Sequence, residues 1–352
     1  MRAHAFVWLT VALGGCGAPP GSPGADLGGD DGAALTPRWA IFSPSVPQQM
    51  PRWGMPLVQV PAERRFVGFG GSLYPGGGAV AETWSLSMKD QSWSLVLDST
   101  PPPAKRYSPC VAWLPDQNEM LLIGGRDDAG PLPPAAWTFN VTLRSWTGIT
   151  GAELPPGVIG CHAAYLPSTG QAIVFGGGGS GGLSSETYAY DPLARTFTRL
   201  SPNTIPPARM DGATAYDPGD GGRMLMFGGA LDVDPAHPQH LDDLWAFDGT
   251  DWTALAQGTH PAARRVAAAA FDGARRAWVI FGGTVETADL NDLWRYDAAR
   301  GAWLQLSGDG APPARGFASA GYDPIDDAYL VLGGLDQPST LALADGWMLH
   351  LQ

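Results

Sequence analysis

The chain has 352 residues and a formal net charge of −13 at pH 7. This acidity opposes contact with phosphate groups, so the composition excludes nucleic acid as an expected partner. Glycine (48 residues) and proline (33 residues) are abundant, 16% of the residues are charged and 44% are hydrophobic, which predicts a turn-rich β protein with a large core and excludes a disordered chain.

The first sixteen residues have the pattern of an export signal. Arg2 precedes an apolar stretch over 5–13, which only Thr10 interrupts, and two glycines lead into Cys16. The sequence LGGC at 13–16 resembles the bacterial lipobox, in which the signal is cut before the cysteine and that cysteine is acylated. The resemblance implies a signal peptide over 1–15 and a lipid on Cys16. An ordinary secretory signal cut near Ala18 is the alternative.

Residues 16–37 read as a flexible linker rich in glycine and proline. After residue 15 no apolar stretch reaches the roughly 18 residues that a membrane span needs. We therefore expect an exported protein of the bacterial cell envelope that only its lipid holds at the membrane surface, on the periplasmic or the extracellular side.

A pair of glycines ends an apolar run six times in the remaining chain. The pairs lie at 70–71, 124–125, 176–177, 228–229, 282–283 and 333–334. A period near fifty residues indicates repeated supersecondary units. Around each pair, the short apolar runs and the turn residues between them predict four strands.

Other positions keep a fixed distance from the glycines. An arginine opens most units, an acidic residue stands two before a third-strand aromatic, and a second aromatic, usually Trp, follows about nine residues later. The third-strand aromatics are Trp84, Trp137, Tyr188, Trp245, Trp294 and Trp347.

This pattern resembles the kelch repeat and covers residues 38–352. The resemblance implies an all-β, six-bladed β-propeller with four antiparallel strands per blade, used most often as a binding scaffold. It brings no cofactor with it, and we expect a monomer.

The two ends of the chain predict how the ring closes. The last unit stops at Gln352 without a fourth strand, whereas Trp39 stands 13 residues before Arg52, as Trp93 stands 13 before Arg106. We expect residues 39–42 to complete the sixth blade and so remove an exposed sheet edge.

The opening arginines allow two interpretations. They are Arg52, Arg106, Arg209, Arg264 and Arg315. One interpretation is a ring of guanidinium groups that binds a carboxylate of a peptide or sugar. The favoured one is structural: salt bridges between blades.

The acids of the repeat suggest the partners for such bridges. They are Glu82, Glu186, Asp243, Asp292 and Asp345. The acid is missing at Ala135 in unit two and the arginine at Val158 in unit three, which favours pairing each acid with the arginine of the next blade. The expected pairs are Glu82 with Arg106, Glu186 with Arg209, Asp243 with Arg264, Asp292 with Arg315 and Asp345 with Arg52.

The longest loop, 230–243, contains weak metal-ligand candidates. They are Asp232, Asp234, His237 and His240. Their spacing matches no dedicated metal motif, so we expect a solvated loop and no metal. His162, on a first strand, is expected to be a packed structural residue.

Two cysteines remain after Cys16. Cys110 and Cys161 lie on first strands of adjacent blades, and an oxidising compartment permits a bridge between them. The spacing of the blades could exceed the Cα limit of about 7 Å, so the sequence leaves the disulfide open.

Two functions from different classes follow. The first is a non-catalytic, lipid-anchored module that binds a protein or a glycan through loops on one face, at 72–81, 126–134, 178–185, 230–241, 284–291 and 335–344. The second is a carbohydrate-active enzyme, because the resemblance extends to exported sialic-acid mutarotases and to the propeller of galactose oxidase. The sequence brings together no Ser/His/Asp or Cys/His set, so an enzyme is the less favoured reading.

Overall fold

The computed structural model describes residues 35–45, 52–73, 77–150, 153–157, 159–231, 239–286, 288–337 and 339–352. These residues form one compact unit that begins at Leu35. The expected signal peptide, Cys16 and most of the linker lie outside them. The described part holds no helix with the length and hydropathy to cross a bilayer.

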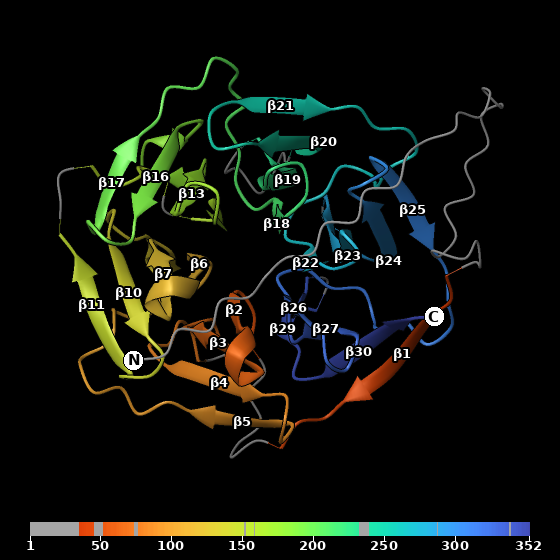
Figure 1. Ribbon diagram of the computed structural model, residues 1–352. Coiled ribbons are helices and arrows are strands. Elements are labelled where there is room, and N and C mark those ends of the chain that lie inside the picture. The colour runs from red at the N-terminus through yellow and green to blue at the C-terminus, as the bar shows by residue number, and fades with distance from the viewer. Residues whose placement is uncertain are drawn as a thin grey trace, which may run out of the picture. The chain divides into compact units, whose positions relative to one another are not determined.

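Six four-stranded antiparallel sheets stand round a central axis as the blades of a propeller (Figure 1). In blade order, the strands are Leu57–Val60 (β2), Arg65–Phe69 (β3), Thr83–Ser87 (β4) and Ser92–Leu95 (β5); Cys110–Leu114 (β6), Glu119–Ile123 (β7), Ala136–Asn140 (β10) and Ser145–Ile149 (β11); His162–Leu166 (β12), Gln171–Phe175 (β13), Thr187–Asp191 (β16) and Thr196–Arg199 (β17); Ala213–Asp217 (β18), Arg223–Ala230 (β19), His240–Phe247 (β20) and Trp252–Leu255 (β21); Ala268–Asp272 (β22), Ala277–Val285 (β23), Ala288–Asp297 (β24) and Ala302–Leu306 (β25); Ser319–Asp323 (β26), Ala328–Leu332 (β27), Gly346–Leu351 (β30) and Pro37–Phe42 (β1).

Short hairpins and 3₁₀ turns follow some of the strands. Three two-residue hairpins follow glycine pairs, at Arg126–Asp127 (β8) with Gly130–Pro131 (β9), Gly178–Gly179 (β14) with Gly182–Leu183 (β15), and Leu335–Asp336 (β28) with Leu341–Ala342 (β29). Two 3₁₀ turns, Pro61–Glu63 (η1) and Pro115–Gln117 (η2), follow the first strands of blades 1 and 2.

The burial of each strand follows from its place in the blade. First strands line the axis and fourth strands form the perimeter (Figure 1). Strand β6 alternates buried and half-buried residues because one of its sides faces the central channel, whereas all five residues of β7 are buried between neighbouring blades. The three alanines at 268–270 lie in β22, because packing overrides helix propensity.

The hydrophobic core consists of six clusters, one between each pair of neighbouring blades. A fourth-strand aromatic residue, which is Trp in five blades and Phe197 in blade 3, contributes to these interfaces. Trp252 of blade 4 packs on Phe175 of blade 3 with ring centroids 4.9 Å apart, and its indole N–H donates to the Thr187 hydroxyl at 3.0 Å. Equivalent contacts join Phe69 with Trp146, Phe227 with Trp303, and Phe281 with Trp39. The repeated Trp is therefore the residue that packs one blade on the preceding one.

The amino-terminal strand closes the ring. Strand β1 pairs antiparallel with β30, with Trp39 opposite Leu349 and Phe42 opposite Gly346. The six-bladed, four-stranded fold and its closure around Trp39 are confirmed; the strand begins two residues earlier than expected, at Pro37.

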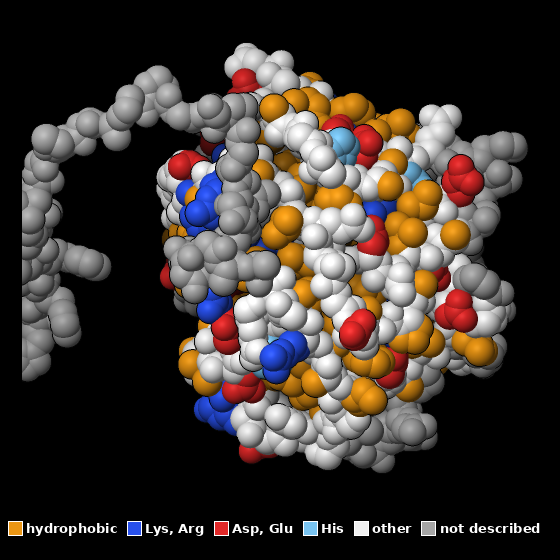
Figure 2. Space-filling model, turned by 90° about the vertical axis from the view of Figure 1, so that its right-hand side faces the viewer, with side chains coloured by type: hydrophobic (Ala, Val, Ile, Leu, Met, Phe, Trp, Pro, Cys, Tyr) orange, Lys and Arg blue, Asp and Glu red, His pale blue; other side chains and the backbone are white. Residues whose placement is uncertain are grey.

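The outer surface on the side of blades 5 and 6 carries no continuous patch of one kind of side chain over its described residues (Figure 2). Hydrophobic and acidic side chains alternate there. Large exposed apolar residues such as Ile325 and Leu341 are single and scattered, as is usual on soluble folds.

Closure can be measured with two substitutions on the same strand. We expect Trp39→Ala to lower the free energy of unfolding by about 2–3 kcal/mol, because it removes the ring that packs on Phe281. The matched control is Ile41→Ala, since Ile41 is 71% exposed. Chemical denaturation that finds equal effects of the two changes would contradict closure by packing.

Candidate functional site

The glycine pair is where neighbouring blades meet. Gly228 and Gly229 have φ angles of +68° and +106°, and the Gly229 N–H donates to the carbonyl of Arg264 in the next blade at 2.9 Å. A Cβ on Gly228 would stand 2.7 Å from that same carbonyl oxygen. Both the left-handed backbone and the close approach therefore require glycine. The same hydrogen bond joins Gly71 with Arg106, Gly177 with Arg209, Gly283 with Arg315 and Gly334 with Arg52.

The arginine side chain then turns back into its own blade. The Arg264 guanidinium donates to the Gly282 carbonyl at 2.9 Å and to both oxygens of Asp292 at 2.6 and 2.8 Å. One residue thus binds the preceding blade through its backbone and its own blade through its guanidinium. The arginine is a junction between blades.

The expected pairing of the acids is wrong by one unit. Four of the five acids pair with the opening arginine of their own blade: Glu82 with Arg52, Asp243 with Arg209, Asp292 with Arg264 and Asp345 with Arg315. The reason is that the third strand lies beside the second strand of the same sheet, so the carboxylate reaches the guanidinium that caps that sheet's glycine pair.

The acid also explains the aromatic two residues after it. Trp294 donates its indole N–H to Asp292 at 2.7 Å, and the same bond joins Trp84 to Glu82, Trp245 to Asp243 and Trp347 to Asp345. Burial raises the pKa of Asp292, but the hydrogen bonds and charge of Arg264 outweigh it, so the net pKa is lowered.

The two incomplete units find other partners. Arg106, which faces Ala135, places its guanidinium 4.3 Å from the centre of the Trp137 ring, and burial lowers its pKa to about 10. Glu186 accepts the Tyr188 hydroxyl and pairs with Arg199 at 2.8 Å. Val158 lies outside the described residues.

The candidate ligand ring of arginines is buried. The exposed fractions are 6% for Arg52, 2% for Arg106, 0% for Arg209, 2% for Arg264 and 1% for Arg315. Each guanidinium group donates to the backbone carbonyl of a glycine in its own blade, which favours the structural interpretation.

A closed cycle of backbone hydrogen bonds encircles the channel. It joins the residues that stand two positions after the opening residue of each blade, which is an arginine in five blades and Val158 in blade 3. The six residues are Gly54, Ser108, Gly160, Asp211, Val266 and Phe317, and each N–H donates to the carbonyl of the same position in the preceding blade, at 2.7–3.2 Å. All six have φ between +50° and +65°. Such a conformation is unfavourable for Val266 and Phe317, so the cycle holds them there.

The residue after each opening position forms the mouth of the channel. Its backbone forms an isolated antiparallel β-bridge with the residue that follows the glycine pair of the same blade. Tyr107 pairs in this way with Arg126, and Arg265 with Thr284. The described parts of the expected rim loops therefore start at this mouth, on one face of the propeller.

Six side chains gather there, and we call them the mouth cluster: Trp53, Tyr107, Phe317, Arg126, Arg265 and Asp211. Trp53 lies 4.7 Å from Tyr107 and 5.0 Å from Phe317, measured between ring centroids. The Arg126 guanidinium stands 5.5 Å from the centre of the Tyr107 ring.

Charge in the mouth cluster is only partly compensated. The Asp211 side chain is 8% exposed and lies 3.7 Å from Arg265, beyond hydrogen-bond distance. Burial raises the pKa of Asp211, against the charges of Arg265 and Arg126. The Nε atoms of Arg126 and Arg265 are buried without a hydrogen-bond partner among the described residues.

Sequence reasoning missed this cluster because its members differ from blade to blade. The available signal was positional: they stand one or two residues after the opening arginine or directly after the glycine pair, on the face where loops gather.

The metal candidates stay largely untested by geometry. Asp232, Asp234 and His237 lie outside the described residues, and the His240 imidazole accepts the Glu286 N–H at 3.2 Å. Within the described ranges, no three His, Cys, Asp or Glu side chains gather as metal ligands would.

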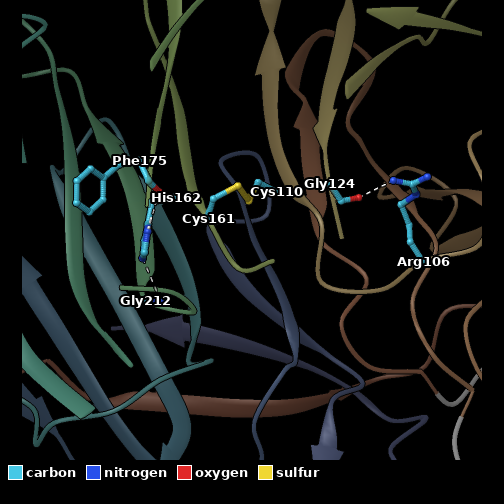
Figure 3. Close-up of a disulfide and its surroundings, with 7 residues drawn as sticks. All are labelled: Arg106, Cys110, Gly124, Cys161, His162, Phe175 and Gly212. Atoms are coloured by element: carbon cyan, nitrogen blue, oxygen red, sulfur yellow. Dashed lines mark hydrogen bonds between the residues drawn. A yellow bond between two sulfur atoms is a disulfide. The ribbon is translucent and has the colours of Figure 1, made fainter. Parts of the chain in front are cut away.

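A disulfide joins Cys110 of blade 2 to Cys161, directly before the first strand of blade 3, with the two Cα atoms 5.5 Å apart (Figure 3). It crosses the interface beside the unit that lacks the opening arginine. A bridge of this kind typically stabilises a fold by about 2–4 kcal/mol.

His162 is packed beside the disulfide (Figure 3). The Gly212 N–H donates to its Nε2 at 3.1 Å, which leaves Nδ1 to donate to the Phe175 carbonyl at 3.3 Å. The ring is therefore neutral, and burial lowers its pKa to about 3.

The incomplete second unit offers a test of the corrected pairing. We expect Ala135→Asp to raise the free energy of unfolding by about 1–2 kcal/mol, because the new carboxylate gives the buried Arg106 and the Trp137 indole N–H an acceptor. Ala135→Asn, of similar size and neutral, should recover less. Denaturation curves in which the Asp variant is no more stable than wild type would contradict within-blade pairing.

The buried histidine predicts an acid-sensitive stability. Its folded pKa, about 3, lies below its ordinary value of 6.5, so its contribution is complete above pH 6.5 and is lost as pH falls towards 3. As the pH is lowered from 6 to 4, we expect the unfolding free energy of His162→Gln to fall less steeply than that of the wild type. The two slopes should differ by about 1.4 kcal/mol per pH unit. Equal slopes in the two proteins would show that His162 is not buried neutral.

Comparison with known families agrees with this architecture. The family model described as KLHDC2/KLHL20/DRC7 Kelch-repeats domain matches residues 55–255 and 171–352. The two overlapping matches span most of the chain and all six glycine pairs, a fold consistent with a binding or scaffold module. The chain belongs to the kelch-repeat family of β-propellers.

Proposed function

We propose that this protein is a lipid-anchored, non-catalytic recognition module of the cell envelope. It binds a protein or glycan through the mouth cluster and the loops around it, and the ligand presents an anionic group to Arg126 and Arg265. The observation that carries this proposal is the weak compensation of these guanidinium groups, since the Asp211 carboxylate lies 3.7 Å from Arg265, beyond hydrogen-bond distance.

The chemistry of the mouth fits such a ligand. Two guanidinium groups, those of Arg126 and Arg265, act on the Asp211 carboxylate. The carboxylate of Asp289, which also interacts with Arg265, accepts hydrogen bonds from the Thr284 hydroxyl and the Gln337 N–H. Trp53 and Phe317 add an apolar wall, and aromatic and arginine side chains dominate the binding energy of interfaces. A carboxylate therefore finds both charge and apolar contact here.

The direction of β1 shows on which face the amino-terminal linker joins the propeller. Its first residue, Pro37, pairs with Leu351, whereas its last, Phe42, pairs with Gly346 beside the Gly333–Gly334 end of the sheet. The chain thus enters the propeller on the face opposite the mouth. The linker that follows Cys16 in the sequence therefore joins the propeller on that face.

The alternative of a carbohydrate-active enzyme loses its main support. It depended on the five opening arginines reaching a substrate at the channel, and these side chains are buried against their own blades. We therefore do not propose it.

Binding of defined probes tests the proposal. The mature lipidated protein in nanodiscs is titrated calorimetrically with a triglutamate peptide and with trigalacturonate, and with triglutamine as a neutral match. We expect an anionic probe to bind and the double variant Arg126→Gln/Arg265→Gln to weaken it at least about tenfold. Arg199→Gln, at an exposed arginine on the perimeter, should change nothing.

Two results would overturn this assignment. One is no heat of binding with either anionic probe at about 10 mM. The other is anionic binding that the double variant leaves unchanged.

A further inference from the structure

We propose that the half of the central channel remote from the mouth is a second ligand site, and that it takes an uncharged saccharide. The site is a cavity of about 560 Å³ lined by the first strands and following turns of five blades. This volume is within the roughly 300–1,000 Å³ of pockets that hold small ligands.

Strand alternation builds the wall of this cavity. Every second residue of a first strand faces the axis, and the fifth residue after each opening position, such as Val111, Ala163 or Thr214, is small or medium-sized. This layer also lines the adjoining cavity of about 280 Å³ beneath the hydrogen-bonded cycle. The mouth cluster and the second site are thus at opposite ends of one channel.

The next layer towards the far face is aromatic. Trp113, Tyr165, Tyr216 and Phe271 occupy the equivalent position in four blades and all line the cavity. In the sixth blade Tyr322 is instead 8% exposed and packs on Tyr329. The aromatic rings surround a space that they do not fill, which packing of the core alone would not require.

A residue outside the cavity fixes the orientation of one side chain of its wall, Tyr165. The Tyr165 hydroxyl donates to Asp116 at 3.0 Å, on the turn after β6 of the neighbouring blade. This bond fixes the phenol and leaves the ring to face the cavity. A site held in this way is preorganised for a flat ligand.

Uncharged polar groups supply the hydrogen bonds. Gln59 stands at the position that is aromatic in the other five blades, and its amide has no partner among the described residues. The Thr214 hydroxyl is likewise without a described partner. Both line the cavity, where an amide and a hydroxyl can each donate and accept.

The lack of charged residues in the cavity wall favours an uncharged ligand. None of the residues that line this cavity is Asp, Glu, Lys, Arg or His. Some nearby charges are bound to each other, as Arg275 is to Asp327 and Arg276 to Asp217, and the Asp116 carboxylate accepts the Tyr165 hydroxyl outside the wall. Burying an ion here would be costly, whereas a neutral sugar offers apolar C–H faces to the rings and hydroxyls to Gln59 and Thr214. The site therefore differs from the mouth, which favours an anion.

The test uses maltotriose, cellotriose and chitotriose as uncharged probes and trigalacturonate as the charged one. Each is titrated into the mature lipidated protein, with tryptophan fluorescence and calorimetry as readouts. We expect an uncharged probe to bind, and both Trp113→Ala and Gln59→Ala to weaken it at least about tenfold. Arg199→Gln, at an exposed position on the perimeter, is the control and should leave this binding unchanged.

The variants keep the test decisive. Gln59 is half-buried, so Gln59→Ala carries the result if Trp113→Ala does not fold. The proposal is overturned if none of the three uncharged probes binds at about 10 mM, or if binding survives the substitution at Gln59. Because the Arg126→Gln/Arg265→Gln variant should retain saccharide binding, failure at the mouth and failure here are distinguishable.

Discussion

The contact between a glycine N–H and the backbone carbonyl of the next blade's arginine is the constraint on which the propeller depends. It occurs where the second strand of a blade ends, and it brings two backbones within 2.9 Å at Gly229 and Arg264. Because a side chain would not fit, each repeat must place glycine there. The guanidinium then binds the carbonyl and the acid of its own blade, so one arginine fixes both the spacing and the orientation of neighbouring sheets.

This junction also explains how the channel acquires two chemically different ends. The arginine side chains are held by hydrogen bonds and ion pairs within their blades. The residues beside them take no part in these contacts and can differ from blade to blade. At the mouth these neighbours supply charge and aromatic surface, as Arg265 and Trp53 do. Five and seven residues after the opening arginines, small and aromatic side chains line the uncharged cavity. A constant scaffold therefore presents variable chemistry, which is the usual division of labour in such folds.

Much of the fold was predictable because six copies of one pattern check each other. The glycine pairs, the fourth-strand tryptophans and the position of Trp39 together specify the blades and their closure. The partners of the acids were not predictable from spacing, since Asp292 is compatible in sequence with either Arg264 or Arg315, and only the sheet geometry decides between them. The mouth cluster escaped prediction because Arg126 and Trp53 belong to no repeated residue type. The sequence also left the Cys110–Cys161 bridge open, because the distance between blades is a property of the assembled ring.

Native-state hydrogen exchange at the second glycines of the pairs tests the central claim most directly. The amides to follow are those of Gly71, Gly177, Gly229, Gly283 and Gly334, each bound to an arginine carbonyl of the next blade. If these bonds hold the ring together, all five amides should exchange only through global unfolding and with similar protection. Exchange of these amides at the rate of exposed turn amides, while the second strands stay protected, would contradict the account.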